Sequence, residues 1–233
     1  RLTFTVAVLV ALFCVGFVGV VEAGSTVVLN RHHRQFLSKL VMIVNQHNRY
    51  VMRQRNAILQ IYARLQQQDN VSIARKNWLQ TMAKIYKVRG FSFSSKKTKR
   101  QLLSKVNAIP ASLVLAQAVN ESSWGRSRFA RLANNLFGMW CYRSGCGIVP
   151  LRRPQGRRYE VKKYPSQADS VVAYFYNLNT NKYYRDFRRA RQVMVASGNK
   201  LSGLELAKYL VGYSERRHVY VASLQNLIRK YRL

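Results

Sequence analysis

Apolar side chains recur at helical spacing over a long stretch near the start of the chain. From residue 30 to 67 they repeat every three or four positions, while arginines and lysines fill the opposite side. The pattern stops at Asp69, and a second helix is expected up to about Val88. The pair Ser94-Ser95 is suited to cap a third helix. The sequence therefore predicts a basic helical region over residues 25–107.

The beginning of the chain is a separate apolar segment. Leu2 to Val21 contains only apolar, threonine and glycine residues, which matches the length that crosses a bilayer as a helix. Val21-x-Ala23 also fits the small-residue cleavage site of a signal peptide, and a buried core helix is the third alternative. We favour a retained or slowly cleaved signal-anchor within residues 1–24, with inner-membrane anchoring by residues 2–21. Either preferred interpretation exports the rest of the chain.

A strongly apolar helix is predicted to begin after Ile109 and to end near an acidic residue. Pro110 suits its first position, because the N–H that proline lacks would have no helical partner there. Leu113 and the apolar residues after it follow the i, i+3, i+4, i+7 spacing of a core-facing helix. Glu121 falls at or near the end of this helix, where a carboxylate seldom serves packing alone. Glu121 is therefore a candidate general acid.

Two opposing effects are expected on the pKa of Glu121. Apolar surface from Trp124, Phe137 and nearby aromatic residues would remove water from the carboxyl and raise its pKa. Arg126 and Arg128 would favour the charged form and lower it. We expect desolvation to prevail and the activity to be greatest at mildly acidic pH. The alternative is a solvated carboxylate at a helix end, beside aromatic residues that belong to the core.

The pattern changes between residues 139 and 166. Glycines and prolines interrupt helices there, and Arg158 to Tyr164 alternates as in a short strand. This is the one convincing strand in the sequence, and it directs Glu160 and Tyr164 to the same face. Helices resume after Pro165. We therefore predict a mainly α (α+β) fold with a small β-hairpin lobe.

The cysteines allow one pair outside the apolar run. Cys14 lies within that run, which leaves Cys141 and Cys146, separated by a short loop that contains Gly145. An oxidising compartment would permit a disulfide between them, and free thiols are the alternative. A zinc site would need better ligand spacing than one Cys-x4-Cys with scattered histidines. We expect no metal or other cofactor, and we expect surface positions for the histidines of the first helix: His32, His33 and His47.

The charge of the chain raises the question of its partners. The formal net charge is +32, from 40 basic and 8 acidic residues. Such a chain could hold phosphates without sequence specificity, as nucleic-acid-binding proteins do. The basic residues are spread over nearly every predicted helix, however, and no nucleic-acid-binding motif is present. We instead expect an anionic membrane or envelope surface as a partner, and no specific nucleic acid.

The motifs around Glu121 are similar to those of a known family. The order Glu121-Ser122-x-Trp124-Gly125, then Arg128-Phe129-Ala130, then Asn134-Asn135-Leu136-Phe137-Gly138 resembles the glucosaminidase domain of glycoside hydrolase family 73. The arrangement as a whole resembles the Bax-type proteins of Gram-negative bacteria. The resemblance is strong over roughly residues 108–232. It implies a lysozyme-like glucosaminidase domain at residues 108–233, peptidoglycan as the substrate, and Glu121 as the catalytic acid.

Further site residues follow from this resemblance and from the acidic residues that remain. The turn at residues 179–184 resembles the one that presents a tyrosine to the active site in the family, which gives Tyr184 that place. Glu160 is the best second carboxylate, because the others fall in the export segment, turns, helix starts or helix surfaces. Its alternative is a strand residue paired with a neighbouring arginine. Residues expected to contact the substrate are Gln117, Trp124, Asn135, Phe137 and Tyr164.

Together these features predict an exported endo-β-N-acetylglucosaminidase that acts on peptidoglycan glycan strands in the periplasm, as a monomer. Two alternatives are a noncatalytic protein that binds the cell wall or membrane on the same scaffold, and a nucleic-acid-binding protein. The second alternative would require that the apolar segment does not export the chain.

Overall fold

The computed structural model describes residues 28–233. The predicted signal-anchor at residues 1–24 therefore lies outside the described residues. Across residues 28–233, no helix combines the length and the apolar character needed to cross a membrane.

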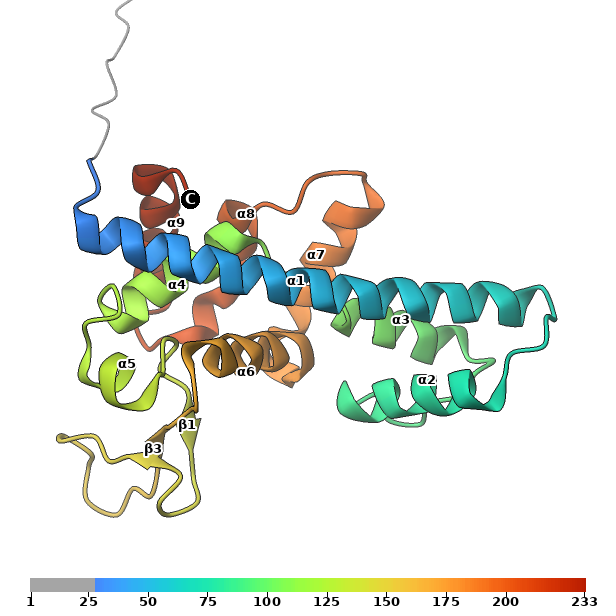
Figure 1. Cartoon of the computed structure of the whole chain (residues 1–233), viewed down its shortest axis with the longest axis horizontal. Helices are drawn as coiled ribbons and strands as arrows, with labels where there is room; N and C mark the ends of the chain where they lie inside the picture. Colours follow the sequence, from blue (N-terminus) through green and yellow to red (C-terminus); the bar gives the residue numbers. More distant parts are fainter. Residues whose placement is uncertain (1–27) are drawn as a thin grey trace, which may run out of the picture.

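The longest element is helix α1 (Arg31–Gln66), which runs across the whole molecule (Figure 1). Asn30 begins it by accepting a 2.8 Å hydrogen bond from the backbone N–H of His33. One face of the helix is buried from Leu40 to Tyr62, while the basic residues of the helix remain exposed except for half-buried Arg55. The helix predicted over residues 30–67 is confirmed.

Helices α2 (Ile73–Ile85) and α3 (Lys96–Lys105) lie below the C-terminal half of α1 (Figure 1). Ser95 caps α3 by accepting a hydrogen bond from the N–H of Thr98, as its sequence position suggested. The N-terminal half of α1 packs on the rest of the molecule. One helix thus joins the basic helical region to the part that contains Glu121.

That second part is a set of helices around α4 (Ala111–Ser122), which contacts α1, α8 and α9. Seven of the eight side chains buried on α4 are those from Leu113 through Val119, so the helix forms the centre of the core. The remaining helices are α5 (Arg128–Ala133), α6 (Gln167–Thr180), α7 (Arg185–Ala196), α8 (Gly203–Ala207), α9 (Arg217–Tyr231) and the 3-10 helices η1 (Lys182–Tyr184) and η2 (Lys208–Tyr213).

The segment just before α4 is fixed by buried side chains from two other helices. Asn48 of α1 exchanges two hydrogen bonds with the backbone of Ile109, at 2.8 and 3.0 Å. Arg191 of α7 is fully buried and donates to the carbonyl oxygens of Ser104, Asn107 and Ala108. Because these bonds satisfy the backbone of a buried connection, they hold the start of α4 in place.

The β lobe differs in detail from the predicted hairpin. It is a three-stranded antiparallel sheet of β1 (Trp140–Cys141), β2 (Gly147–Ile148) and β3 (Glu160–Lys162), in the order β1-β3-β2. Strands of two residues, such as β1 and β2, are too short for alternation to reveal them, so the sequence indicated only β3. Gly147 lies so close to β3 that an added Cβ would be 2.0 Å from the carbonyl oxygen of Val161. The mainly α fold with a small β lobe, expected for a lysozyme-like domain, is confirmed.

Candidate functional site

Glu121 lies in the last turn of α4. Pro110 is the residue before the first helical position, one earlier than predicted. At the other end, Ser123 takes a left-handed conformation (φ 50°), so the helix ends two residues before Gly125. Buried Ser122 donates to the carbonyl oxygen of Ala118 at 2.6 Å and accepts from the N–H of Gly125 at 2.8 Å. These bonds fix the turn that follows Glu121.

The carboxyl group of Glu121 is largely removed from water. Burial raises its pKa, and hydrogen bonds from the side chains of Tyr220 and Asn120 together with the charge of Arg216 act in the opposite direction. The pKa of Glu121 is therefore raised, as the sequence predicted. The expected source of positive charge is corrected, because Arg216, just before α9, faces the carboxyl instead of Arg126 or Arg128. Packing of α9 against α4 brings Arg216 there.

A buried hydrogen-bond chain leads to this carboxyl. Gln117 lies one turn before Glu121 and therefore on the same side of α4. It is 0% exposed, accepts a hydrogen bond from the hydroxyl of Tyr174, and donates from Nε2 to the hydroxyl oxygen of Tyr220 at 2.7 Å. Since that oxygen accepts from Gln117, the hydroxyl hydrogen of Tyr220 is free to bond to Glu121. The chain fixes the direction of each hydrogen bond.

Tyrosines from three elements surround Glu121. Tyr213 and Tyr220 stack with parallel rings 5.7 Å apart, and Tyr213 also donates to the carbonyl oxygen of Phe137 at 2.8 Å. The ring centroid of Tyr184 is 6.1 Å from that of Tyr213. The glycine after Phe137, Gly138, has a positive φ of 64°, and a Cβ there would lie 3.5 Å from Oε2 of Glu121. The backbone of the 137–138 turn thus lies directly against the carboxyl.

Tyr184, which the family resemblance placed at the active site, is part of this group. It ends η1 and is buried, which raises its pKa to about 12; a hydrogen bond with Asn177 opposes this rise and the charge of Glu121 adds to it. Its hydroxyl therefore stays protonated at neutral pH and can donate a hydrogen bond.

Glu160 is bound to the loop of the disulfide. Its carboxylate accepts hydrogen bonds from the N–H groups of Gly145 at 3.0 Å and Gly147 at 2.8 Å, and these bonds hold its pKa below the ordinary value. Cys141 and Cys146 are joined by a disulfide across the same loop. Both sulfur atoms lie within 4.8 Å of the Glu160 carboxylate, but a disulfide offers no thiolate to a metal ion.

Most residues expected to contact the substrate lie below the surface. Asn135 is buried, and its side chain bonds to the carbonyl oxygens of Met139 and Lys162 and to the N–H groups of Phe137 and Met139. Phe137 is buried in a stack with Tyr174 at 4.2 Å. Gln117 is buried as well, so Gln117, Asn135 and Phe137 support the site from the interior of the protein. Tyr164 is 5% exposed, and its hydroxyl has no hydrogen-bond partner among the described residues.

Trp124 packs against α1 and α9. Its ring stacks on His33 with 3.8 Å between centroids and meets Tyr231 edge-on at 5.0 Å, while His32 bonds to its carbonyl oxygen at 2.8 Å. The expected surface positions of the histidines are therefore only partly correct: all three are half-buried, and His47 packs on Phe175. These contacts attach the turn after Glu121 to the first helix.

Tyr220 and Arg216 were not singled out as site residues from the sequence. Tyr220 follows Tyr213 by seven residues, which is two helical turns, but the intervening segment is not one helix. No local pattern therefore links Tyr220 to Glu121, about a hundred positions earlier in the chain. The signal that was present is Gln117, a polar side chain in an otherwise apolar helix, which implies a buried polar partner.

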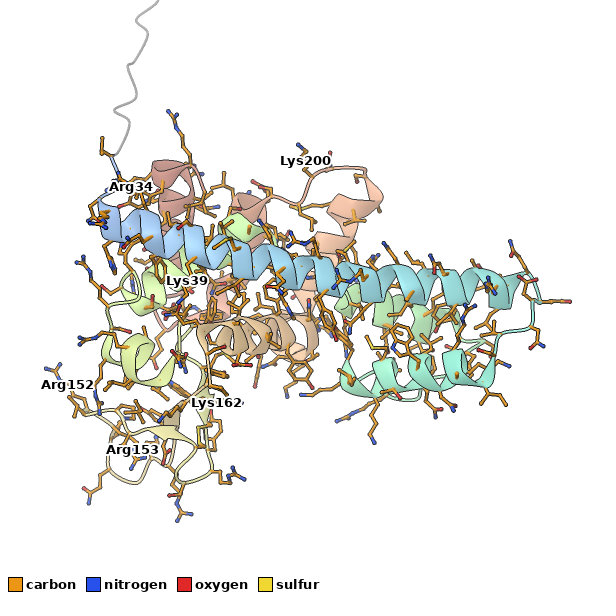
Figure 2. The ribbon with its side chains drawn as sticks, viewed as in Figure 1. Arg34, Lys39, Arg152, Arg153, Lys162 and Lys200 are labelled. Atoms are coloured by element: carbon orange, nitrogen blue, oxygen red, sulfur yellow. A yellow bond between two sulfur atoms is a disulfide. The ribbon has the colours of Figure 1, made fainter. Side chains whose placement is uncertain are left out.

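Basic side chains cover the described surface without a single centre. Figure 2 shows them on α1 (Arg34 and Lys39), in the β lobe (Arg152, Arg153 and Lys162) and between α7 and α8 (Lys200). The site around Glu121 therefore lies within a generally cationic protein.

Comparisons with known proteins match the part of the chain that contains this site. The family model described as mannosyl-glycoprotein endo-beta-N-acetylglucosaminidase matches residues 97–233, which begin in α3 and include Glu121 and Tyr220. Protein bax of Escherichia coli (strain K12) is 32% identical over 187 residues. The matched region is 80% of this chain and 65% of that protein's length. No solved structure matches the chain significantly.

Proposed function

We propose that this chain hydrolyses β-1,4 glycosidic bonds in the glycan strands of peptidoglycan. The chain belongs to the mannosyl-glycoprotein endo-beta-N-acetylglucosaminidase family, which supports the proposal. The observation that carries the proposal is the carboxyl of Glu121. It ends an apolar helix, burial raises its pKa, and a tyrosine hydroxyl fixes its orientation. A general acid needs this combination, because it must be protonated when it meets the leaving oxygen.

In this proposal Glu121 donates its proton to the glycosidic oxygen as the bond to the anomeric carbon breaks. The carboxylate that remains is stabilised by Tyr220, and it accepts a proton from the water that completes the hydrolysis. Activity should therefore fall as the pH rises through the pKa of Glu121, with an optimum on the acidic side of neutrality.

The hydrogen bonds that the Glu160 carboxylate already accepts bear on the choice of the second catalytic group. Each of its oxygens already accepts a backbone N–H, from Gly145 or Gly147, and these bonds lower its pKa, which makes the carboxylate a weaker nucleophile or base. We therefore propose that Glu160 positions the β lobe. The positive charge at the sugar is then stabilised by the substrate's own N-acetyl group, with Tyr184 as a hydrogen-bond donor.

A location outside the cytoplasm fits both the substrate and the disulfide between Cys141 and Cys146. The glycan is the proposed partner, and the basic surface would favour adsorption to an anionic envelope.

The test compares the full chain with its Glu121→Gln variant on purified peptidoglycan. Glu205→Gln is the matched control, since Glu205 is an exposed carboxylate paired with Lys208 at 2.7 Å. Released fragments are reduced with borohydride and identified by mass spectrometry. Reduced N-acetylglucosamine ends from the wild type and the control, but not from Glu121→Gln, are expected.

Other outcomes change the proposal in defined ways. Reduced N-acetylmuramic acid ends would keep Glu121 as the acid and change the bond that is cut. Cleavage by folded Glu121→Gln at the wild-type rate would remove Glu121 from the mechanism. Binding to the wall without cleavage by any version would indicate a noncatalytic wall-binding protein.

A further inference from the structure

A pocket of about 700 Å³ opens where three parts of the molecule meet. The β lobe contributes Met139 and Trp140, and the end of α6 contributes Tyr176 and Asn177. The basic helical region contributes the turn after α2 and the end of α3. The pocket is therefore formed jointly by residues on both sides of the predicted boundary near residue 107.

Positive charge enters this pocket from every side. Lys87, Arg89 and Lys105 come from the basic helical region. Lys182, Arg185 and Arg188 come from η1 and α7, and Lys162 comes from β3. Within residues 28–233, no Asp or Glu lines the pocket. Of these cations, Arg185 has a carboxylate nearby, Asp186 at 4.0 Å, and both side chains are largely exposed.

Two of these cations are withdrawn from water, Arg188 almost wholly and Lys105 in part, and within residues 28–233 neither forms a salt bridge. Arg188 is 5% exposed and donates to the carbonyl oxygens of Leu178 and Asn181, each at 2.8 Å. Burial, and then the charge of Arg185, lower its pKa to about 10. The pKa of Lys105 is lowered by burial and then by Arg188, among other cations. Mutual repulsion of this kind is relieved when an anion binds.

The pocket is lined by residues that adjoin the site around Glu121. Gly138, whose backbone lies against the Glu121 carboxyl, directly precedes the two pocket residues Met139 and Trp140. On the other wall, Asn177 lines the pocket and bonds to Tyr184. Two short stretches of chain therefore connect the pocket to the proposed general acid.

Aromatic side chains at the pocket add a surface for a sugar or peptide. Trp140 is 51% exposed and is held flat against Tyr159, with 4.2 Å between ring centroids. Tyr164, with its unpaired hydroxyl, lies on the same lobe beneath Lys162, whose Nζ is 5.1 Å from the ring centroid. A ligand with both anionic and uncharged parts matches this lining.

We propose that this pocket binds the carboxylates of the peptide stems that branch from the glycan strand. The proposal rests on the proposed function, because a stem enters the pocket when its glycan lies against Glu121. The chain then prefers glycan that carries stems over bare glycan. The five exposed cations of the lining bind the stem through charge-assisted hydrogen bonds, and they are Lys87, Arg89, Lys162, Lys182 and Arg185. Lys87 and Arg89 give the basic helical region a role in substrate choice.

A concave site favours a peptide stem over a flat anionic surface. A lipid bilayer would contact exposed basic residues outside the pocket, such as Arg34, Lys39 and Lys200 (Figure 2). A segment branching from the substrate can instead reach into a pocket beside the acid. Membrane binding therefore makes a different prediction, which the experiment separates.

The experiment measures binding to the full chain carrying Glu121→Gln, so that no cleavage interferes. The probe is N-acetylmuramyl-tetrapeptide, followed by calorimetry, beside the same molecule with its carboxylates amidated. The pocket variant is Arg89→Gln with Lys162→Gln, two exposed lining residues from the turn after α2 and from β3. The matched control, Lys39→Gln with Lys200→Gln, removes the same charge outside the pocket.

The acidic probe is expected to bind and the amidated probe to bind at least tenfold more weakly. The pocket variant should weaken binding about five- to tenfold, as expected for two partly solvated ion pairs, and the control should change it less than twofold. With Glu121 restored, the pocket variant should lower kcat/KM on stem-bearing peptidoglycan and leave cleavage of amidase-treated, bare glycan unchanged.

Equal binding by the pocket variant and the control, or equal binding of both probes, would overturn the proposal. So would binding to phosphatidylglycerol vesicles that depends on Arg89 and Lys162 when the stem probe does not bind, which would indicate a lipid site. Cleavage of bare glycan is measured separately. It therefore distinguishes failure of the stem pocket from failure of the glycosidase itself.

Discussion

Replacing Tyr220 by phenylalanine removes one oxygen from the interior and changes two hydrogen bonds. The hydroxyl accepts from Nε2 of Gln117 at 2.7 Å and bonds to the carboxyl of Glu121. Because Tyr220 is 1% exposed, water does not readily replace either bond. The ring and its stacking on Tyr213 remain, so the change tests the hydroxyl alone.

The magnitude follows from the kinds of bond that are lost. Leaving the buried amide of Gln117 without its acceptor should cost about 1–3 kcal/mol of stability. The bond from Tyr220 favours the charged form of Glu121 and so lowers its pKa. Its loss therefore raises that pKa, and a hydrogen bond to a charged group is worth about 1.5–3 kcal/mol.

The assay is the pH dependence of kcat/KM on peptidoglycan, together with carbon NMR titration of labelled glutamate carboxyls. An acid that must be protonated loses activity as the pH rises through its pKa. Tyr220→Phe should therefore move this loss to higher pH, while its maximal rate falls because the carboxylate formed in the reaction is less stabilised. The few glutamates of a chain with eight acidic residues make the NMR signals assignable.

Tyr213→Phe is the matched control, because the Tyr213 hydroxyl donates to the carbonyl oxygen of Phe137 and not to Glu121. It should lower stability and leave the pH of half-maximal activity in place. A Tyr220→Phe profile that stays in place or moves to lower pH, from protein shown to be folded, would refute the assigned role of this hydroxyl.

Two further predictions concern the supports of the site. Glu160→Gln should lower the melting temperature, because an amide offers one acceptor to the N–H groups of Gly145 and Gly147. Folding lowers the pKa of Glu160, so the loss of melting temperature relative to wild type should be largest at pH values above the ordinary pKa of 4.5. It should shrink as the pH falls through the pKa of the folded state, and a loss that does not depend on pH would contradict this. Trp124→Ala should lower the free energy of unfolding by about 3 kcal/mol in urea titrations, through the lost packing on His33 and Tyr231, and an unchanged midpoint would count against this anchoring.

Local physical chemistry explains why several elements could be predicted. The apolar stripe of α1 extends over ten turns, so its helical period is clear in the sequence. The cap at Ser95 acts within three residues of its partner, the N–H of Thr98. The disulfide closes a loop of few residues. In each case the interacting groups are neighbours in the chain.

Short strands and side-chain directions were beyond this kind of reasoning. β1 and β2 contain two residues each and exist because β3 passes between them. The sequence likewise indicated that Asn135, Phe137 and Trp124 matter, and it suggested contact with the substrate. Only the packing shows their contacts within the protein, which are with Met139, Tyr174 and His33, while contact with the substrate stays a prediction.

The sequence by itself determined the helical scaffold, the position of Glu121 at the end of an apolar helix, the family and the strong positive charge. Only the tertiary structure decided which groups act on Glu121. Tyr220 and Arg216 reach it because α9 packs on α4. The tertiary structure also bound Glu160 to the disulfide loop and gathered cations from α3, β3 and α7 into one pocket. The physical reason is that desolvation and charge act through space over a few ångströms, whereas sequence patterns record only neighbours along the chain.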